Sequence, residues 1–158
     1  MARSIRQRRL QAKTDYKARL ALLKSNKPRL VIRKTNRYII VQFVESSIAQ
    51  DKVIVGTSSE ILLSKGWPKD KKGSLKSLPA CYLAGFVLGK MAKDKVKTAI
   101  LDMGMYRNIQ KSRIYAALRG VIDSGITIPH NEKSLPSIEE IGRNKNTFGI
   151  FDKMRKSM

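Results

Sequence analysis

Residues 29 to 44 read RLVIRKTNRYIIVQFV, and this stretch decides the fold. Two runs rich in β-branched residues flank the triplet Thr35-Asn36-Arg37, whose residue types favour a turn, so the stretch predicts a β-hairpin. A third such run occupies residues 52 to 56 after a short connection. Residues 29 to 57 are therefore predicted to form an antiparallel meander of three strands.

Helical periodicity takes over after the meander. Residues 78 to 93 are predicted to form a helix. One face of that helix carries four apolar side chains: Cys81, Ala84, Leu88 and Met91. A short buried strand follows at 98–101, and a second helix is capped by Ser112 and stops at Gly125. This order predicts an α/β fold in which helices pack on a mixed sheet.

Some residues of this region are predicted to have structural roles. Gly85 and Gly89 each cost about 1 kcal/mol inside a helix, so we expect the helix backbone to approach the sheet closely there. The only cysteine, Cys81, has apolar neighbours, which favours a buried core thiol over a reactive one. Trp67 is expected to anchor the Lys-rich loop 64–77, with base stacking as the alternative.

Composition points to a polyanionic partner. The 158 residues are 42% hydrophobic, which suits one domain with one core. Lys and Arg number 33 against 12 acidic residues, and a net charge of +21 is typical of proteins that lie beside nucleic acid. No apolar run reaches the ~18 residues of a membrane span. Residues 1 to 13 lack the apolar stretch of a signal peptide, so we expect a cytoplasmic protein.

Both ends of the chain are basic. We expect a basic arm at 1–13, a single globular domain at 14–142 and a basic tail at 143–158, and neither end is expected to be ordered without RNA. The pattern Ser137-x-x-Glu140 predicts a capped short helix before the tail.

An amphipathic helix is predicted directly after the arm. Its apolar residues, at helical spacing before a stop at Pro28, are Tyr16, Leu20 and Leu23. If the helix extended backwards, it would align four cations along its outer face: Arg6, Arg9, Lys13 and Lys17. Such a stripe fits a phosphate backbone, and a solvated charged face is the alternative.

Five ordered sequence blocks resemble one known family. The blocks are TDY at 14–16 with RL at 19–20 and LLKS at 22–25, KPRLV at 27–31 with RKTNR at 33–37, PACYLAG at 79–85, AILDMG at 99–104 and GVIDSGITIPHN at 120–131. Together they resemble the archaeal branch of the ribosomal protein L18 family.

The resemblance implies a structural protein of the large ribosomal subunit. It implies that the protein binds 5S rRNA in the central protuberance and helps to attach it to 23S rRNA, without enzyme activity or a cofactor. Neighbouring large-subunit proteins, among them universal ribosomal protein L5, are the implied protein partners.

The hairpin suits RNA binding. Residues i and i+2 of a strand share a face, so Arg29 and Arg33 are expected to offer two guanidinium groups to phosphates, while Leu30 and Ile32 face the core. At the turn, Thr35 and Asn36 carry short polar groups that can reach a base edge or a 2′-hydroxyl. For Asn36 the alternative is a left-handed turn conformation.

A second candidate patch lies at the start of the next helix, where free backbone amides also favour phosphate, and it consists of Arg107, Lys111, Ser112 and Arg113. The candidate RNA-binding residues of the whole chain are Arg6, Arg8, Arg9, Lys13, Tyr16, Arg19, Arg29, Arg33, Lys34, Thr35, Asn36, Arg37, Arg107, Lys111, Ser112 and Arg113.

Two other classes of protein share features with this sequence. An Mg²⁺-dependent enzyme would need convergent acids, for which the candidates are Asp102, Asp123, Glu132 and Glu139. Acids are few, and Asp102 before Gly104 equally suits a tight turn. His130, the only histidine, follows Pro129 and favours a hydrogen-bonding role over a general base. A non-ribosomal RNA chaperone or regulator also fits the composition.

Overall fold

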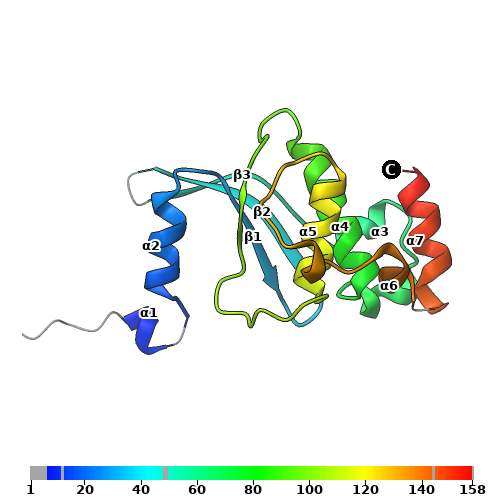
Figure 1. The fold of residues 1–158 in the computed structure, drawn as a ribbon. Coiled ribbons are helices and arrows are strands. Elements are labelled where there is room, and N and C mark those ends of the chain that lie inside the picture. The colour runs from blue at the N-terminus through cyan, green and yellow to red at the C-terminus, as the bar shows by residue number, and fades with distance from the viewer. Residues whose placement is uncertain (1–6, 12, 48–49, 144, 158) are drawn as a thin grey trace, which may run out of the picture.

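The protein, described by a computed structural model over residues 7–11, 13–47, 50–143 and 145–157, is built from short helices around one sheet (Figure 1). The elements are α1 (Gln7–Leu10), α2 (Tyr16–Lys24), β1 (Arg29–Lys34), β2 (Ile39–Ser47), β3 (Gln50–Ser58), α3 (Ile61–Ser64), the 3₁₀ helix η1 (Lys69–Ser74), α4 (Leu78–Ala92), β4 (Ile100–Asp102), α5 (Arg113–Asp123), the 3₁₀ helix η2 (Glu132–Ser134), α6 (Ile138–Gly142) and α7 (Lys145–Ser157). Within these ranges no helix has the length and apolarity to cross a membrane.

The sheet is mixed, with the strand order β3-β2-β1-β4. β1 pairs antiparallel with β2, and β2 pairs antiparallel with β3. This confirms the predicted three-stranded meander. β4 pairs in parallel with the other edge of β1, with Arg29 opposite Ile100. The predicted α/β class with a mixed sheet is therefore confirmed.

α4 and α5 lie side by side against the sheet, α4 over β2 and β3 and α5 over β1 (Figure 1). The strands turn their alternate apolar residues toward these helices, so that Leu30 and Phe43 are fully buried. One residue of α4 departs from the prediction. Met91 is 49% exposed, because Leu88 and Ala92, one turn apart, occupy the buried face at that end of the helix.

The glycines of α4 pack against α5 and not against the sheet. A Cβ on Gly85 would lie 2.0 Å from the carbonyl oxygen of Ala117, and one on Gly120 would lie 2.0 Å from the carbonyl oxygen of Tyr82. The predicted close approach is confirmed, but its predicted partner was wrong. Glycine on both helices lets two backbones touch, which no residue with a side chain would allow.

The C-terminal segment folds as part of the domain. In α7, Phe151 is 0% exposed and Met154 is 4% exposed. Both belong to a second apolar cluster with Trp67 and Tyr82, and the Tyr82 and Phe151 rings meet edge to face with centroids 5.5 Å apart. The prediction of a tail outside the domain is therefore corrected for residues 145 to 157, because Phe151 and Met154, three residues apart, give α7 an apolar stripe.

The N-terminal helices do not form the continuous basic stripe. Asp15 caps α2 by accepting hydrogen bonds from the amides of Lys17 and Ala18, and α1 is a separate turn. The predicted alignment of positions 6, 9, 13 and 17 along one helix is therefore wrong. The amphipathic helix predicted after the arm is present as α2, but α2 buries no residue and Leu20 is 55% exposed.

Smaller predictions are confirmed. Trp67 is 2% exposed and its Nε1 donates to the carbonyl of Lys71, so it anchors the loop and offers no face to a base. Cys81 is fully buried, and this burial raises the pKa of its thiol to about 12, which keeps it protonated and unreactive. Ser137 and Glu140 form the predicted capping box of α6.

Candidate nucleic-acid interface

Arg29 begins β1 but is not available to RNA. Its side chain is 4% exposed, and its guanidinium donates to the carboxylates of Asp102 and Asp51 at 3.0 and 2.8 Å and to the hydroxyl of Ser46 at 2.8 Å. The expectation that Arg29 offers a guanidinium fork to phosphates is therefore corrected. Two carboxylates occupy that fork inside the protein, where an unpaired charge would be costly.

Arg33 shares the same carboxylate from the more exposed side. Its guanidinium donates to Oδ1 and to the backbone carbonyl of Asp102 at 2.9 and 2.8 Å, while its side chain stays 39% exposed. Asp102 Oδ1 also accepts from the amide of Gly104, which has a left-handed φ of +64°. Asp102 therefore holds β1 to the turn after β4, and Arg33 has unused exposed surface beside it.

Asp51 extends this network to α2. It accepts from Arg29 and from Arg19 of α2, whose Nη2 lies 3.0 Å from Asp51 Oδ2. Burial raises the pKa of Asp51, but the hydrogen bonds from Ser46 and Arg29 and the charges of Arg29 and Arg19 outweigh this, so the pKa lies below its ordinary value. The charged carboxylate is thus the favoured form, and it connects α2 to the sheet.

The hairpin turn is held by Thr35. Its hydroxyl donates to the carbonyl of Tyr38 and accepts from the amides of Arg37 and Tyr38. Thr35 is thus committed to the turn and is not free to reach a base edge. Asn36 is exposed and does not have a positive φ, which rules out the left-handed alternative. Asn36 and Arg37 remain exposed at the tip.

The arm is described only in part. Arg6 lies outside the described residues, and the side chain of Arg9 is not described either. Arg8 is exposed and its Nε donates to the hydroxyl of Thr14 at 2.9 Å, and Lys13 is exposed.

A groove of about 910 Å³ separates α2 from β1 and β4. The described residues that line it include five basic ones: Arg8 and Lys13 of the arm, Arg19 of α2, and Arg29 and Arg33 of β1. The structure thus brings the arm and the first strand of the hairpin together. Tyr16, also predicted to bind RNA, does not line this groove.

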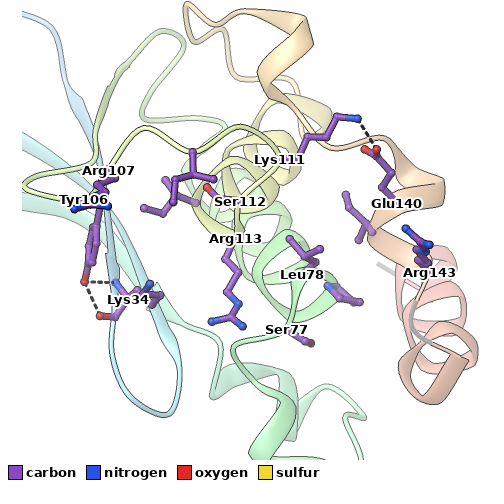
Figure 2. Close-up of a pocket in the computed structure, with 14 residues that line it drawn as sticks. Lys34, Ser77, Leu78, Tyr106, Arg107, Lys111, Ser112, Arg113, Glu140 and Arg143 are labelled. Atoms are coloured by element: carbon purple, nitrogen blue, oxygen red, sulfur yellow. Dashed lines mark hydrogen bonds and ion pairs between the residues drawn. The ribbon is translucent and has the colours of Figure 1, made fainter.

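A second pocket, of about 840 Å³, lies on the other side of Tyr106 (Figure 2). It unites Lys34 of the hairpin with the whole second predicted patch: Arg107, Lys111, Ser112 and Arg113. Ser112 stands at the N-cap of α5, where its carbonyl accepts from the amide of Ala116, but its hydroxyl makes no cap hydrogen bond. Capping by the Ser112 side chain is therefore not observed.

Lys111 is held in an uncommon backbone conformation, with φ at +55°. Its amide donates to the carbonyl of Ser134, and its ammonium group pairs with Glu140 of α6. The hydrogen bond from Lys111 lowers the pKa of Glu140. The charge of Lys111 is thus paired with a neighbouring carboxylate, and its backbone hydrogen bond holds the segment that leads into α5.

Three residues of this second pocket were missed by sequence reasoning: Ser77, Tyr106 and Arg143. The Tyr106 hydroxyl donates to the carbonyl of Lys34 and accepts from its amide, at 2.6 and 3.2 Å. Tyr106 lines both the groove and the pocket. A single Tyr between two loop residues carries no sequence signal, whereas Arg143 was visible as charge and was assigned to the tail.

The groups considered for catalysis do not converge. Within the described ranges, no cluster of three or more His, Cys, Asp or Glu side chains could hold a metal ion. Asp123 accepts from Tyr82 and Arg119, and His130 Nδ1 lies 2.7 Å from the carbonyl oxygen of Ile128. These polar groups hold local structure.

Comparison with known proteins agrees with the block pattern in the sequence. The family model described as "Ribosomal large subunit proteins 60S L5, and 50S L18" matches residues 3–99 and 91–131. The large ribosomal subunit protein uL18 of Korarchaeum cryptofilum is 48% identical over 147 residues, which is 89% of this chain and 73% of the relative. The uL18 of Aeropyrum pernix is 42% identical, over 85% of this chain and 62% of the relative. The uL18 of Methanospirillum hungatei is 41% identical, with corresponding shares of 84% and 74%. The chain therefore belongs to the family of large-subunit ribosomal proteins that includes 60S L5 and 50S L18.

Proposed function

We propose that this chain is a structural constituent of the large ribosomal subunit that binds 5S rRNA and helps to attach it to 23S rRNA in the central protuberance. Family membership supports the ribosomal role. The observation that carries the RNA-binding role is the pair of basic cavities on either side of Tyr106, each lined by five Lys or Arg side chains. A net charge of +21 supplies the long-range attraction.

Such a surface recognises folded RNA through its backbone. The deep groove of an A-form helix hides its base edges, so phosphate positions and unpaired bases provide the recognition. The exposed cations beside the cavities would neutralise phosphates, while Asn36 and Arg37 at the hairpin tip can reach a base edge or a 2′-hydroxyl. Arg29 contributes indirectly, because its buried pairs hold β1 and β4 in place.

Residues 1 to 13 act in this proposal as a basic arm along the RNA backbone. Neighbouring large-subunit proteins, among them universal ribosomal protein L5, would complete the assembly in the cytoplasm. No small-molecule substrate or cofactor is required.

Binding of purified protein to 5S rRNA tests the proposal. With about 6 to 10 phosphate contacts, affinity is expected to fall by about 10³ to 10⁵ between 50 and 200 mM salt. Asn36→Ala and Arg37→Gln should weaken binding to 5S rRNA more than to an unrelated duplex. Lys95→Gln, which removes a charge before β4 at the other end of β1, serves as the matched control. A salt-independent affinity would contradict the proposal.

Co-sedimentation separates the ribosomal role from that of a chaperone or regulator outside the ribosome. An assembled ribosomal protein should stay with the large subunit through a high-salt gradient, whereas a loosely bound chaperone should leave it. Release at high salt together with an unchanged subunit would count against the ribosomal role.

We also infer that the chain is not an enzyme. The Asp102 carboxylate is engaged by Arg29 and Arg33 and so is poorly placed to hold Mg²⁺. Stringently purified protein should leave RNA intact with Mg²⁺ present, and Asp102→Asn should change nothing in that assay. A stoichiometric Mg²⁺-dependent cleavage that this variant loses would contradict the inference.

A further inference from the structure

α4 and α5 begin at the same pocket. Their contacts advance in the same direction along both chains, since a Cβ on Gly85 would meet Ala117 and one on Gly89 would meet Ser124. The two helices therefore run parallel, and their first residues, Leu78 and Arg113, line the pocket together. Each first turn leaves amides without helical acceptors and carries about half a positive charge. Two such ends side by side repel each other unless an anion lies between them.

Both N-cap residues hold an unused hydroxyl. Ser77 precedes α4 and Ser112 precedes α5, and neither hydroxyl makes a cap hydrogen bond. Ser77 Oγ is closed off from solvent and has no hydrogen-bond partner among the described residues. The second residue of α4 is Pro79, which has no amide hydrogen for Ser77 to accept. Because solvent does not reach Ser77 Oγ, a ligand in the pocket does not reach it either, and Ser112 is the N-cap residue whose hydroxyl is available as a donor.

The charges around the pocket are unbalanced. Five of its described lining residues are basic, and Glu140, its single acid, is paired with Lys111. Within the described part of the chain, Arg107, Arg113 and Arg143 have no carboxylate within ion-pair distance. Figure 2 shows the Arg113 guanidinium extending between Lys34 and Ser77, next to the start of α4.

We propose that this pocket binds one phosphate group of an RNA strand. Arg113 and Lys34 supply the opposite charge, while the hydroxyl of Ser112 and the free amides of both first turns donate hydrogen bonds. Donors from several sides suit the tetrahedral array of phosphate oxygens better than the flat pair of a carboxylate. The choice of RNA as the source of the phosphate rests on the proposed function, and Lys34 connects the pocket to the hairpin.

Titration with inorganic phosphate tests the pocket by itself. The full chain, ¹⁵N-labelled and held at constant ionic strength, should show saturable shifts of the Leu78 and Arg113 amide resonances. Arg113→Gln should weaken phosphate binding about tenfold or more, as expected for a lost hydrogen bond to a charged group. Lys90→Gln removes the same charge at the far end of α4 and should change it less than about twofold. Lys34→Gln, which removes the other proposed charge from an exposed side chain of β1, should weaken phosphate binding in the same way and provides a second variant if Arg113→Gln does not fold.

Shifts that do not saturate, or equal weakening by Arg113→Gln and Lys90→Gln, would overturn the proposal. So would saturation by a hexaglutamate peptide without saturation by phosphate, which would make the pocket a protein-docking site.

Titrations with RNA identify the source of the phosphate. 5S rRNA should shift the same amides, and free phosphate should compete with it there. If phosphate saturates the pocket but 5S rRNA leaves these amides unmoved, the RNA assignment is wrong and the site serves free phosphate. If Arg113→Gln binds 5S rRNA as the unmodified chain does, the pocket proposal fails while 5S rRNA binding stands. If the unmodified chain does not bind 5S rRNA at all, the proposed function fails instead.

Discussion

The two basic ends of this chain look alike in charge and differ in structure. At the N-terminal end, α2 stands apart from the helices on the sheet and buries none of its residues (Figure 1). At the C-terminal end, α7 lies beside α4 and buries Phe151 and Met154. The comparison teaches that net charge does not decide whether a terminal segment folds onto a domain. A terminal segment folds onto the domain when its apolar side chains contact an apolar partner, because each such side chain buries a large apolar surface area.

The difference in attachment follows from the partner surface. α7 meets the side of α4 that carries Tyr82 and Leu83, away from the sheet. α2 faces the part of the sheet where Arg29, Arg33 and Asp102 form an ion network. Ile100, Leu101 and Met103 also line the groove, but α2 buries none of its residues against them, and the ion pair of Arg19 with Asp51 connects it to the sheet.

Truncation of Phe151 should have the largest effect. Phe151→Ala removes a fully buried ring from the second cluster and should lower the free energy of unfolding by about 3 to 5 kcal/mol. Leu20→Ala on α2, where the side chain is 55% exposed, should change it by less than about 0.5 kcal/mol. Urea unfolding of both variants measures the difference. Similar losses in the two variants would remove the contrast between the ends.

Periodicity predicted the main elements because the core is built from alternating and helical apolar patterns. The meander at 29–57 and the helices α4 and α5 follow those patterns directly. The role of α7 was missed because the five Lys or Arg residues in 143–158 were given more weight than the apolar residues between them. The stripe Phe151 and Met154 was the available signal.

The candidate site was predicted in pieces. The residue types of the hairpin and of the Arg107 to Arg113 patch indicated anion binding, and the structure brings Lys34 to that patch. No local pattern could reveal that Arg29 is neutralised, since its partners Asp51 and Asp102 are 22 and 73 residues away. Tyr106 was likewise beyond prediction, because its hydroxyl bonds to the backbone of Lys34, 72 residues away.

Removal of residues 1 to 13 should affect RNA binding more than stability. Because the arm holds five cations and few apolar groups, the free energy of unfolding should change by less than about 0.5 kcal/mol. Affinity should fall for all RNAs alike, and the salt dependence should become shallower by about 0.7 to 0.9 per lost phosphate contact. Affinities of the truncated chain for 5S rRNA and a control duplex over a salt series check this. Loss of discrimination between the two RNAs would move specificity from the hairpin tip to the arm.

The smallest effect concerns the charge that connects α2 to the sheet. The folded pKa of Asp51 lies below its ordinary value of 3.8, so its contribution to stability is complete above about pH 4 and disappears as the pH falls through the folded pKa. Because the Asp51 side chain is 34% exposed, solvent screening limits the contribution to less than about 1 kcal/mol.

Asp51→Asn should therefore be slightly less stable than the unmodified chain at pH 7, and the two stabilities should converge on acidification. Asp94→Asn, which removes an exposed carboxylate without an ion pair among the described residues, should follow the unmodified chain throughout. Urea unfolding from pH 7 to pH 3 measures the three curves, and amide exchange in α2 should quicken only in Asp51→Asn. A difference between Asp51→Asn and the unmodified chain that stays constant over this range would show that α2 is attached by contacts other than this charge.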